Sequence, residues 1–253
     1  MKPIITSKRN IQFATITTIA ALLIVFISSI AIFYSSPEST KPIPRKQSYA
    51  WMSLSEWFVL HAQDIELAEV GESKIIFLGD SITQNWSETE VWQKYFQPLN
   101  ALNFGIGGDT TQNLLWRLEN GATGNLNPER VVLLIGTNNL SFVEETPKEI
   151  ALGAIAIVKN IKTAFPEAKI LLMAVLPREE QPNHPYRIAI EQLNQHLQTA
   201  EKLENVTYLD IGRQFLLPNG KISPILMPDF LHPAEKGYQI WTKEILQWIN
   251  SSK

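Results

Sequence analysis

Five short apolar runs constrain the fold of this chain more than any other feature. They occupy residues 74–78, 101–104, 130–135, 169–175 and 206–209, and a glycine, proline or aspartate lies at or near the end of each. The runs are rich in branched side chains and are apolar on both faces, as is typical of strands buried within a parallel sheet. We therefore predict five buried parallel strands.

Helical patterns separate these runs. Thr146 is a capping residue, Pro147 suits the first helical position, and Glu149 completes a capping box. Apolar residues recur at helical spacing after this cap and again near the end of the chain. Alternation of strand and helix predicts a doubly wound sheet, and right-handed crossovers then produce a three-layer α/β/α sandwich. Ligands of such sheets bind at the carboxyl ends of the strands.

The N-terminal part of the chain carries a different signal. Residues 11–34 contain no charged side chain, and about 20 apolar residues suffice for a membrane-spanning helix. We predict a short basic tail at 1–10, a transmembrane anchor at 11–34, a flexible proline-containing linker at 35–49 and one catalytic domain at 50–253. A cleaved signal peptide is the alternative, although the apolar stretch is longer than an ordinary signal-peptide core.

Basic residues flank the predicted anchor on both sides, so the positive-inside rule favours neither membrane orientation strongly. Lys2, Lys8 and Arg9 precede the anchor, and Lys41, Arg45 and Lys46 follow it. The N-terminal amine adds charge in front, and the basic residues behind lie farther from the apolar stretch. We therefore expect a single-pass membrane protein whose catalytic domain is extracytoplasmic.

Composition excludes several classes of function. The chain has no cysteine, which rules out disulfides, a thiol nucleophile and thiolate metal sites. The four histidines show no paired metal-ligand spacing, so we predict no metal site. The formal net charge of −3 provides no basic surface for nucleic acid.

A serine follows the first predicted strand in the segment Gly79-Asp80-Ser81. Gly79 permits a tight turn, and Ser81 would begin the next segment, where unpaired backbone N–H groups favour developing negative charge. A helix cap is the ordinary role of such a serine, so Ser81 alone does not establish catalysis. Asp80 is expected to organise the turn.

Glycines and an asparagine follow the next two strands. In residues 105–110, the Gly108 N–H is a candidate oxyanion donor, because glycines let a ligand approach the backbone. An ordinary turn is the alternative, and the segment matches neither the P-loop nor the Rossmann pattern. The Asn138 side chain is a second candidate donor, with a plain turn as its alternative.

An aspartate and a histidine precede the last helix. Pro233 can occupy the first helical position, which makes His232 the cap residue. Asp229 could hold the imidazole through Nδ1 and leave Nε2 facing Ser81. The alternative is a surface loop in which the two side chains occur by chance.

Taken in order, these motifs resemble the SGNH, or GDSL-type, hydrolases, whose defining residues are Ser, Gly, Asn and His. The matching positions are Ser81, Gly108, Asn138 and His232, with Asp229 three residues before the histidine. The resemblance implies a flavodoxin-like fold with a five-stranded parallel sheet and no metal or organic cofactor. It also implies a Ser81–His232–Asp229 triad and an oxyanion hole formed by the Ser81 N–H, the Gly108 N–H and the Asn138 side chain.

Residues 51–249 are further similar to the catalytic subunits of intracellular platelet-activating-factor acetylhydrolases. The similar segments are 51–54, 99–110, 115–121, 136–139 and 176–178. This similarity implies hydrolysis of a short acyl ester. The N-terminus departs from those soluble relatives, because this chain begins with a predicted membrane segment.

Three residues adjacent to the predicted catalytic residues are expected to shape the acyl pocket: Ile82, Thr137 and Leu231. Their bulk favours a short chain such as acetyl. The leaving group stays open between a phospholipid or lysophospholipid, an O-acetylated polysaccharide and a small ester. The lipase pattern Gly-x-Ser-x-Gly is absent, since Thr83 occupies the second glycine position, which disfavours the α/β-hydrolase fold.

The expected partners are a small acyl-ester substrate and a membrane, the latter through the N-terminal helix. We expect no nucleic acid, and a homodimer is compatible with the sequence. A non-catalytic, membrane-tethered binding module with the same fold is the alternative function. A substituted triad residue would be its sign, and the sequence contains no such substitution.

Overall fold

The part of the chain that the structure describes covers nearly all of the predicted catalytic domain and most of the predicted linker. The structure is a computed structural model, and it describes residues 36–143 and 145–251. The predicted tail at 1–10 and the predicted anchor at 11–34 lie outside these residues. Within the described ranges, no helix has both the length and the apolar character needed to cross a membrane.

Five parallel strands form one sheet, which confirms the predicted fold class. The strands are β1 (Ile75–Gly79), β2 (Leu102–Gly105), β3 (Arg130–Leu134), β4 (Lys169–Met173) and β5 (Val206–Leu209). Their order in the sheet is β2-β1-β3-β4-β5. Gly79 lies opposite Gly105 on one side and Leu134 on the other. The carboxyl ends of β1, β2 and β3 are therefore neighbours, and the motif residues follow all three.

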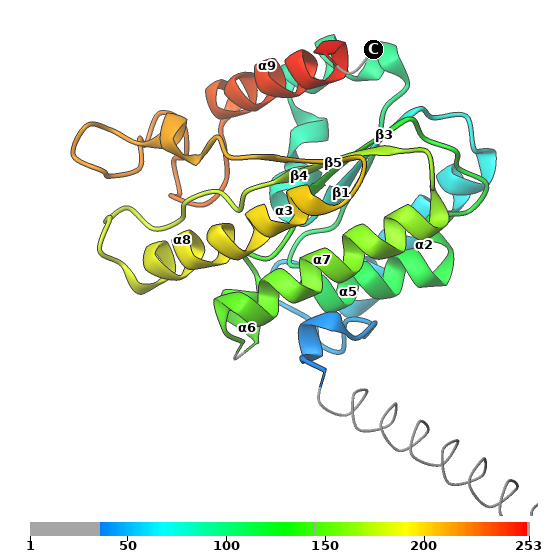
Figure 1. Cartoon of the computed structure of the whole chain (residues 1–253), viewed down its shortest axis with the longest axis horizontal. Helices are drawn as coiled ribbons and strands as arrows, with labels where there is room; N and C mark the ends of the chain where they lie inside the picture. The colour runs from blue at the N-terminus through cyan, green and yellow to red at the C-terminus, as the bar shows by residue number, and fades with distance from the viewer. Residues whose placement is uncertain (1–35, 144, 252–253) are drawn as a thin grey trace, which may run out of the picture. The chain divides into compact units, whose positions relative to one another are not determined.

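Helices cover both faces of this sheet (Figure 1). On one face lie α2 (Leu54–Val70), α5 (Thr111–Arg117), α7 (Pro147–Ala164) and α8 (Pro185–Leu197). On the other lie α3 (Ser81–Gln84), α4 (Glu90–Tyr95) and α9 (Glu235–Ser251). The short α6 (Asn139–Phe142) follows β3. Single-turn segments complete the chain: η1 (Glu38–Thr40), η2 (Asn85–Glu88), η3 (Gln97–Leu99), η4 (Leu118–Ala122), η5 (Gln198–Lys202) and η6 (Gly212–Phe215).

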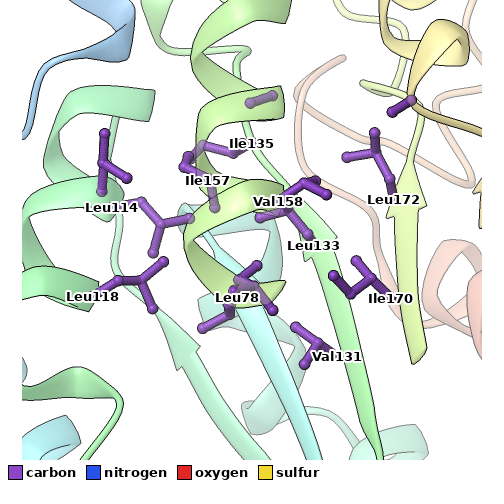
Figure 2. Packing of buried hydrophobic residues seen from close by; sticks show 14 of the residues in the cluster. Leu78, Leu114, Leu118, Val131, Leu133, Ile135, Ile157, Val158, Ile170 and Leu172 are labelled. Atoms are coloured by element: carbon purple, nitrogen blue, oxygen red, sulfur yellow. The ribbon is translucent and has the colours of Figure 1, made fainter. Parts of the chain in front are cut away.

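Each face of the sheet has its own hydrophobic core, because successive strand side chains point to opposite faces. Leu78 of β1 belongs to the cluster under α5 and α7, and Phe77 belongs to the cluster under α4 and α9. Figure 2 shows Leu78 and Leu133 close to Ile157 and Val158 of α7. Full burial of such a side chain contributes about 1.5–3 kcal/mol, so the two cores anchor the strand ends that carry the motifs.

The predicted start of the helix at residue 147 is confirmed. Thr146 is the N-cap of α7, and its side chain accepts a hydrogen bond from the Glu149 N–H at 3.3 Å. The Glu149 carboxylate accepts from the Thr146 N–H at 2.8 Å, which completes the capping box. Pro147 is the first helical residue. This local signal was complete in the sequence because every partner lies within one turn.

Residues 36–49 differ from the flexible linker predicted at 35–49. Ser39 is fully buried, and its hydroxyl donates to the Glu149 carbonyl at 2.6 Å. The Ile43 N–H donates to the Gln112 carbonyl at 3.1 Å, and Arg45 is buried. From Ser39 onwards, the segment is attached to the domain through single polar groups and through Tyr49, whose ring stacks on that of Phe142. It therefore lacks the periodicity by which a packed element is recognised.

The start of the last helix also differs from the prediction. The helix α9 begins at Glu235, so Pro233 is not its first residue and His232 is not its cap. The Ala234 carbonyl accepts from the Tyr238 N–H at 3.0 Å, which makes Ala234 the last residue before the helix. The Asp229 carboxylate accepts from the His232 backbone N–H at 2.7 Å and holds the histidine in the preceding turn.

Candidate active site

Ser81, His232 and Asp229 lie in one hydrogen-bonded row. Ser81 is the first residue of α3, directly after β1, and its Oγ lies 2.9 Å from His232 Nε2. His232 Nδ1 lies 2.6 Å from Asp229 Oδ2. In a neutral imidazole, the bond to the carboxylate assigns the proton to Nδ1. His232 Nε2 is then the acceptor that faces the Ser81 hydroxyl.

Asp229 is held as a carboxylate by three donors. Besides the His232 ring, the backbone N–H groups of Leu231 and His232 donate to Asp229 Oδ1 at 3.0 and 2.7 Å. Partial burial by itself would raise the pKa of Asp229, but these hydrogen bonds outweigh it and hold the pKa below its usual value. Asp229 is therefore an anionic acceptor at neutral pH, and it fixes the orientation of the imidazole.

The turn between β1 and α3 explains why Ser81 is not the helix cap. Asp80 occupies that position, and its Oδ1 accepts from the Ile82 N–H at 3.0 Å. This is the turn-organising role expected for Asp80. A Cβ at Gly79 would collide with the Thr83 hydroxyl and would lie 2.5 Å from the Leu134 carbonyl oxygen. Glycine thus permits the close packing that brings Ser81 to the end of the sheet.

The three candidate oxyanion donors follow three adjacent strands. The Ser81 N–H has no intrahelical acceptor, because it belongs to the first turn of α3. Gly108 has a φ of 75°, and its N–H has no acceptor among the residues that the structure describes. Asn138 is buried and donates from Nδ2 to the Asp109 carbonyl at 3.0 Å, which uses one of its two amide protons. Across the described ranges, no hydrogen bond joins Ser81 directly to Gly108 or Asn138.

The predicted acyl-pocket residues lie in three different settings. Ile82 is 1% exposed and belongs to the core under α9. Leu231 is half-buried and packs against the same core. Thr137 is buried, and in the described part of the chain its hydroxyl has no hydrogen-bond partner. Of the three, Leu231 is the side chain that can be altered with the least damage to the core.

Asp80 is fully buried, and its Oδ2 finds no hydrogen-bond partner within the described ranges. Burial raises the pKa of Asp80 from 3.8 to about 7. Between these two values, the folded chain retains a proton that the unfolded chain has released. The free energy of unfolding therefore falls as the pH rises through this window.

We expect Asp80→Asn to remove this contribution to the pH dependence. Asparagine can still accept from the Ile82 N–H, and it carries no charge at any pH. The stability of the variant relative to the unaltered protein should rise between pH 4 and pH 8 by a few kcal/mol at most, since one pKa unit corresponds to about 1.4 kcal/mol. Urea denaturation of both proteins at the two pH values measures this change. An equal difference at both pH values would contradict the raised pKa.

A buried ionic cluster of Arg45, Asp64, Asp109 and Arg117 lies beside the Gly108 loop, and no motif in the sequence predicts it. Arg117 Nε lies 2.8 Å from Asp109 Oδ2, and its Nη1 lies 2.8 Å from Asp64 Oδ2. Arg45 Nη2 lies 3.2 Å from Asp109 Oδ1. The cluster contains two cations and two carboxylates, so its charges balance. Arg45 and Asp109 lie 64 positions apart in the chain, and Asp64 and Arg117 lie 53 apart, so no local sequence signal could have paired them.

A second set of missed residues lies in the loop after β4. Arg178 Nη1 donates to the Thr137 carbonyl at 3.3 Å and to the Ser141 hydroxyl at 2.7 Å. The Glu179 N–H donates to the Phe230 carbonyl at 2.8 Å. The loop therefore contacts both the Asn138 segment and the Asp229–His232 turn. In the sequence, residues 176–178 were noted only as one of the segments similar to the acetylhydrolase subunits, and no contact was predicted for them.

A cavity of about 540 Å³ lies near the carboxyl ends of β4 and β5. Its lining includes Val175, Asn194, Tyr208 and Arg213 but none of Ser81, Asp229 and His232. It brings together no nucleophile and base of the kind that acyl transfer uses, so the serine row is the better candidate for catalysis. In the part of the chain described, no group of three or more metal-ligating side chains is found.

The chain is similar to known hydrolases, in agreement with the hydrogen-bonded row of Ser81, His232 and Asp229. A family model described as the GDSL-like Lipase/Acylhydrolase family matches residues 77–240. The alpha2 subunit of platelet-activating factor acetylhydrolase IB from Rattus norvegicus is 45% identical over 189 residues, which cover 74% of this chain and 78% of that protein.

Two solved structures share the fold. A GDSL-like lipase from Bacteroides thetaiotaomicron has a TM-score of 0.67 at 23% identity, covering 78% of this chain and 98% of its own. An acetylxylan esterase from Geobacillus stearothermophilus has a TM-score of 0.53 at 23% identity, covering 71% of this chain and 95% of its own. At this level of identity the two similarities concern the fold alone.

Proposed function

Because this chain belongs to the GDSL-like lipase/acylhydrolase family and is an ester hydrolase, we propose that it is a serine esterase acting on short acyl esters. Ser81 is the nucleophile, His232 the general base and Asp229 the group that orients the imidazole. The oxyanion donors are the Ser81 N–H, the Gly108 N–H and the Asn138 amide. One observation carries this proposal: the continuous row from Ser81 Oγ through the His232 ring to Asp229, with contacts of 2.9 and 2.6 Å.

The reaction has two halves. Ser81 Oγ attacks the ester carbonyl carbon while its proton passes to His232 Nε2, and the carbonyl oxygen becomes an oxyanion. His232 then protonates the leaving oxygen, the ester C–O bond breaks, and an acyl-serine remains. Water attacks the acyl carbon and gives a proton to His232, which returns a proton to Ser81 Oγ as the carboxylic acid leaves. Asp229 stabilises the imidazolium that forms in each half.

The acyl group is proposed to be short. Ile82, Thr137 and Leu231 each adjoin a triad or oxyanion residue, and Ile82 and Thr137 are buried. Bulky side chains beside the reacting carbon would leave little room for a long chain. The name of a similar relative, a platelet-activating factor acetylhydrolase subunit, supports an acetyl ester.

A chain-length series tests this proposal. We expect the purified full-length protein to hydrolyse aryl acetates fastest, with kcat/KM falling steadily from acetate to hexanoate and octanoate. Leu231→Ala should shift the preference towards longer chains, because it removes bulk beside His232. One methylene in an apolar pocket changes kcat/KM by about 10- to 200-fold, so we expect a shift of this size in the chain-length preference of Leu231→Ala.

The matched control is Leu217→Ala, which removes the same atoms from an exposed leucine. That variant should keep the chain-length profile of the unaltered protein. A maximum at octanoate in the unaltered protein would contradict the short-acyl assignment. Parallel assays of the unaltered protein on an acetylated phospholipid and on an O-acetylated polysaccharide would show which of the two classes of ester it hydrolyses faster.

A further inference from the structure

Arg45 lies in the segment that was predicted to be a linker, yet it reaches the Gly108 loop. Its side chain is buried, and its Nη2 donates to the Gly107 carbonyl at 2.5 Å and to Asp109 Oδ1 at 3.2 Å. Its Nη1 contacts the Met52 sulfur at 3.0 Å. Its guanidinium also lies 5.7 Å from the centre of the Trp57 ring. The charged group of Arg45 is therefore held from several sides.

The contact with the Gly107 carbonyl matters because of the peptide to which that oxygen belongs. The Gly107 C=O and the Gly108 N–H are two ends of one planar unit, and in a trans peptide they point in opposite directions. A donor that holds the carbonyl on one side fixes the N–H on the other. The Gly108 N–H is the donor proposed for the oxyanion.

This peptide is one that would otherwise turn easily. It joins two glycines, which have wider conformational freedom than any other residue, and Gly108 has a φ of 75°. The Gly107 N–H donates to Gln84 Oε1 at 2.7 Å, which restrains the preceding peptide. The hydrogen bond from the Arg45 guanidinium to the next carbonyl is charge-assisted and therefore stronger than a neutral one.

Aromatic packing closes the same side of the loop. A Cβ at Gly108 would come within 2.5 Å of Trp51 Cη2 and 3.0 Å of Arg45 Nη2. Trp51 and Arg45 thus occupy the face of the loop towards which a Gly108 side chain would project. Both residues precede α2 in the chain.

We propose that Arg45 is a positioning residue that sets the Gly107–Gly108 peptide so that the Gly108 N–H faces the oxyanion. The inference rests on the proposed function, and it extends the catalytic unit to a segment well outside the four family motifs. Arg45 touches neither Ser81 nor His232, so its influence must pass through the glycine loop.

The test uses the purified full-length protein and the variants Arg45→Met and Arg45→Lys. Both should lower kcat for an aryl acetate by about 10- to 100-fold, somewhat less than complete loss of an oxyanion donor, and KM should change by less than about twofold. Lysine keeps the charge beside Asp109 but has a single ammonium, so it cannot hold the carbonyl and the carboxylate in the same way. The affinity for a trifluoromethyl ketone, which forms an oxyanion on the serine, should fall by the same factor as kcat.

Ser39→Ala is the matched control. Ser39 belongs to the same segment, but its hydroxyl binds the Glu149 carbonyl on α7 and not the glycine loop. This variant should lower thermal stability and leave kcat unchanged at temperatures where it is folded. A fall in kcat with nearly unchanged KM, matched by the loss of inhibitor affinity, would indicate that Arg45 positions the Gly108 N–H. A general loosening of the segment would affect Ser39→Ala in the same way.

Two results would overturn the inference alone: a folded Arg45 variant with unaltered kcat, or a loss of kcat in Ser39→Ala equal to that in Arg45→Lys. If Arg45→Met does not fold, Arg45→Lys decides the question. Absence of ester hydrolysis by the unaltered protein would overturn the proposed function and this inference together. The two failures are therefore distinguishable.

Discussion

Ser81→Ala should reduce kcat for aryl acetates by about 10⁶-fold, the order seen when the serine of a triad is removed from other hydrolases. The change deletes the only oxygen that lies within hydrogen-bond distance of His232 Nε2 in the described part of the chain. Stability should change by about 1 kcal/mol or less, since one partly exposed hydrogen bond is lost. Steady-state kinetics and urea denaturation measure the two effects on one protein preparation.

Ser87→Ala makes the same chemical change six residues away, where the exposed Ser87 hydroxyl donates to the Gln84 carbonyl. This variant should keep full activity. A fluorophosphonate probe should label the unaltered protein and Ser87→Ala but not Ser81→Ala. Undiminished hydrolysis by Ser81→Ala would remove Ser81 as the nucleophile. A failure of the probe to label the unaltered protein would favour the non-catalytic binding module.

Arg117→Met should lower the free energy of unfolding by about 3–5 kcal/mol, the usual effect of removing one partner from a buried ion pair. Arg117 is completely buried and lies 2.8 Å from both Asp109 Oδ2 and Asp64 Oδ2. Its Nη2 also donates to the Phe104 carbonyl at 2.9 Å. Methionine fills similar space but leaves the cluster with one cation and two carboxylates. Urea denaturation at pH 7 measures the loss.

The control for this change is Arg213→Met, which makes the same replacement at an exposed arginine. Its stability should stay within about 0.5 kcal/mol of the unaltered protein. A loss below about 1 kcal/mol in Arg117→Met would mean that the buried carboxylates are neutralised in another way. The cluster would then not be the support of the Gly108 loop that its contacts indicate.

Local signals in the sequence were sufficient for the sheet and for the order of the motifs. Each strand is a short apolar run that needs no distant partner to be recognised, and the capping box at Thr146 and Glu149 is complete within one turn. The alternative role of Ser81 as a helix cap could not be excluded locally. The structure assigns that role to Asp80.

Local signals failed at two places: the turn before the last helix and a segment held by distant polar partners. Pro233 favoured a helix start that the structure does not adopt, because the Asp229 carboxylate holds His232 in the preceding turn. The segment 36–49 lacked apolar periodicity and was predicted to be flexible. Its attachment depends on Ser39 and Arg45, whose partners Glu149 and Asp109 lie 110 and 64 positions away in the chain.

The sequence by itself determined the parallel sheet and the residues that stand at its strand ends, because apolar runs and turn residues act over a few positions. Only the tertiary structure decided that Ser81 and His232, which are 151 positions apart, lie 2.9 Å from each other. It also decided that Arg45 and Arg117 share one buried carboxylate beside the glycine loop. The physical reason is that charge pairing and hydrogen bonding depend on distance in space, and a buried ion is stable only where the whole fold brings its partners together.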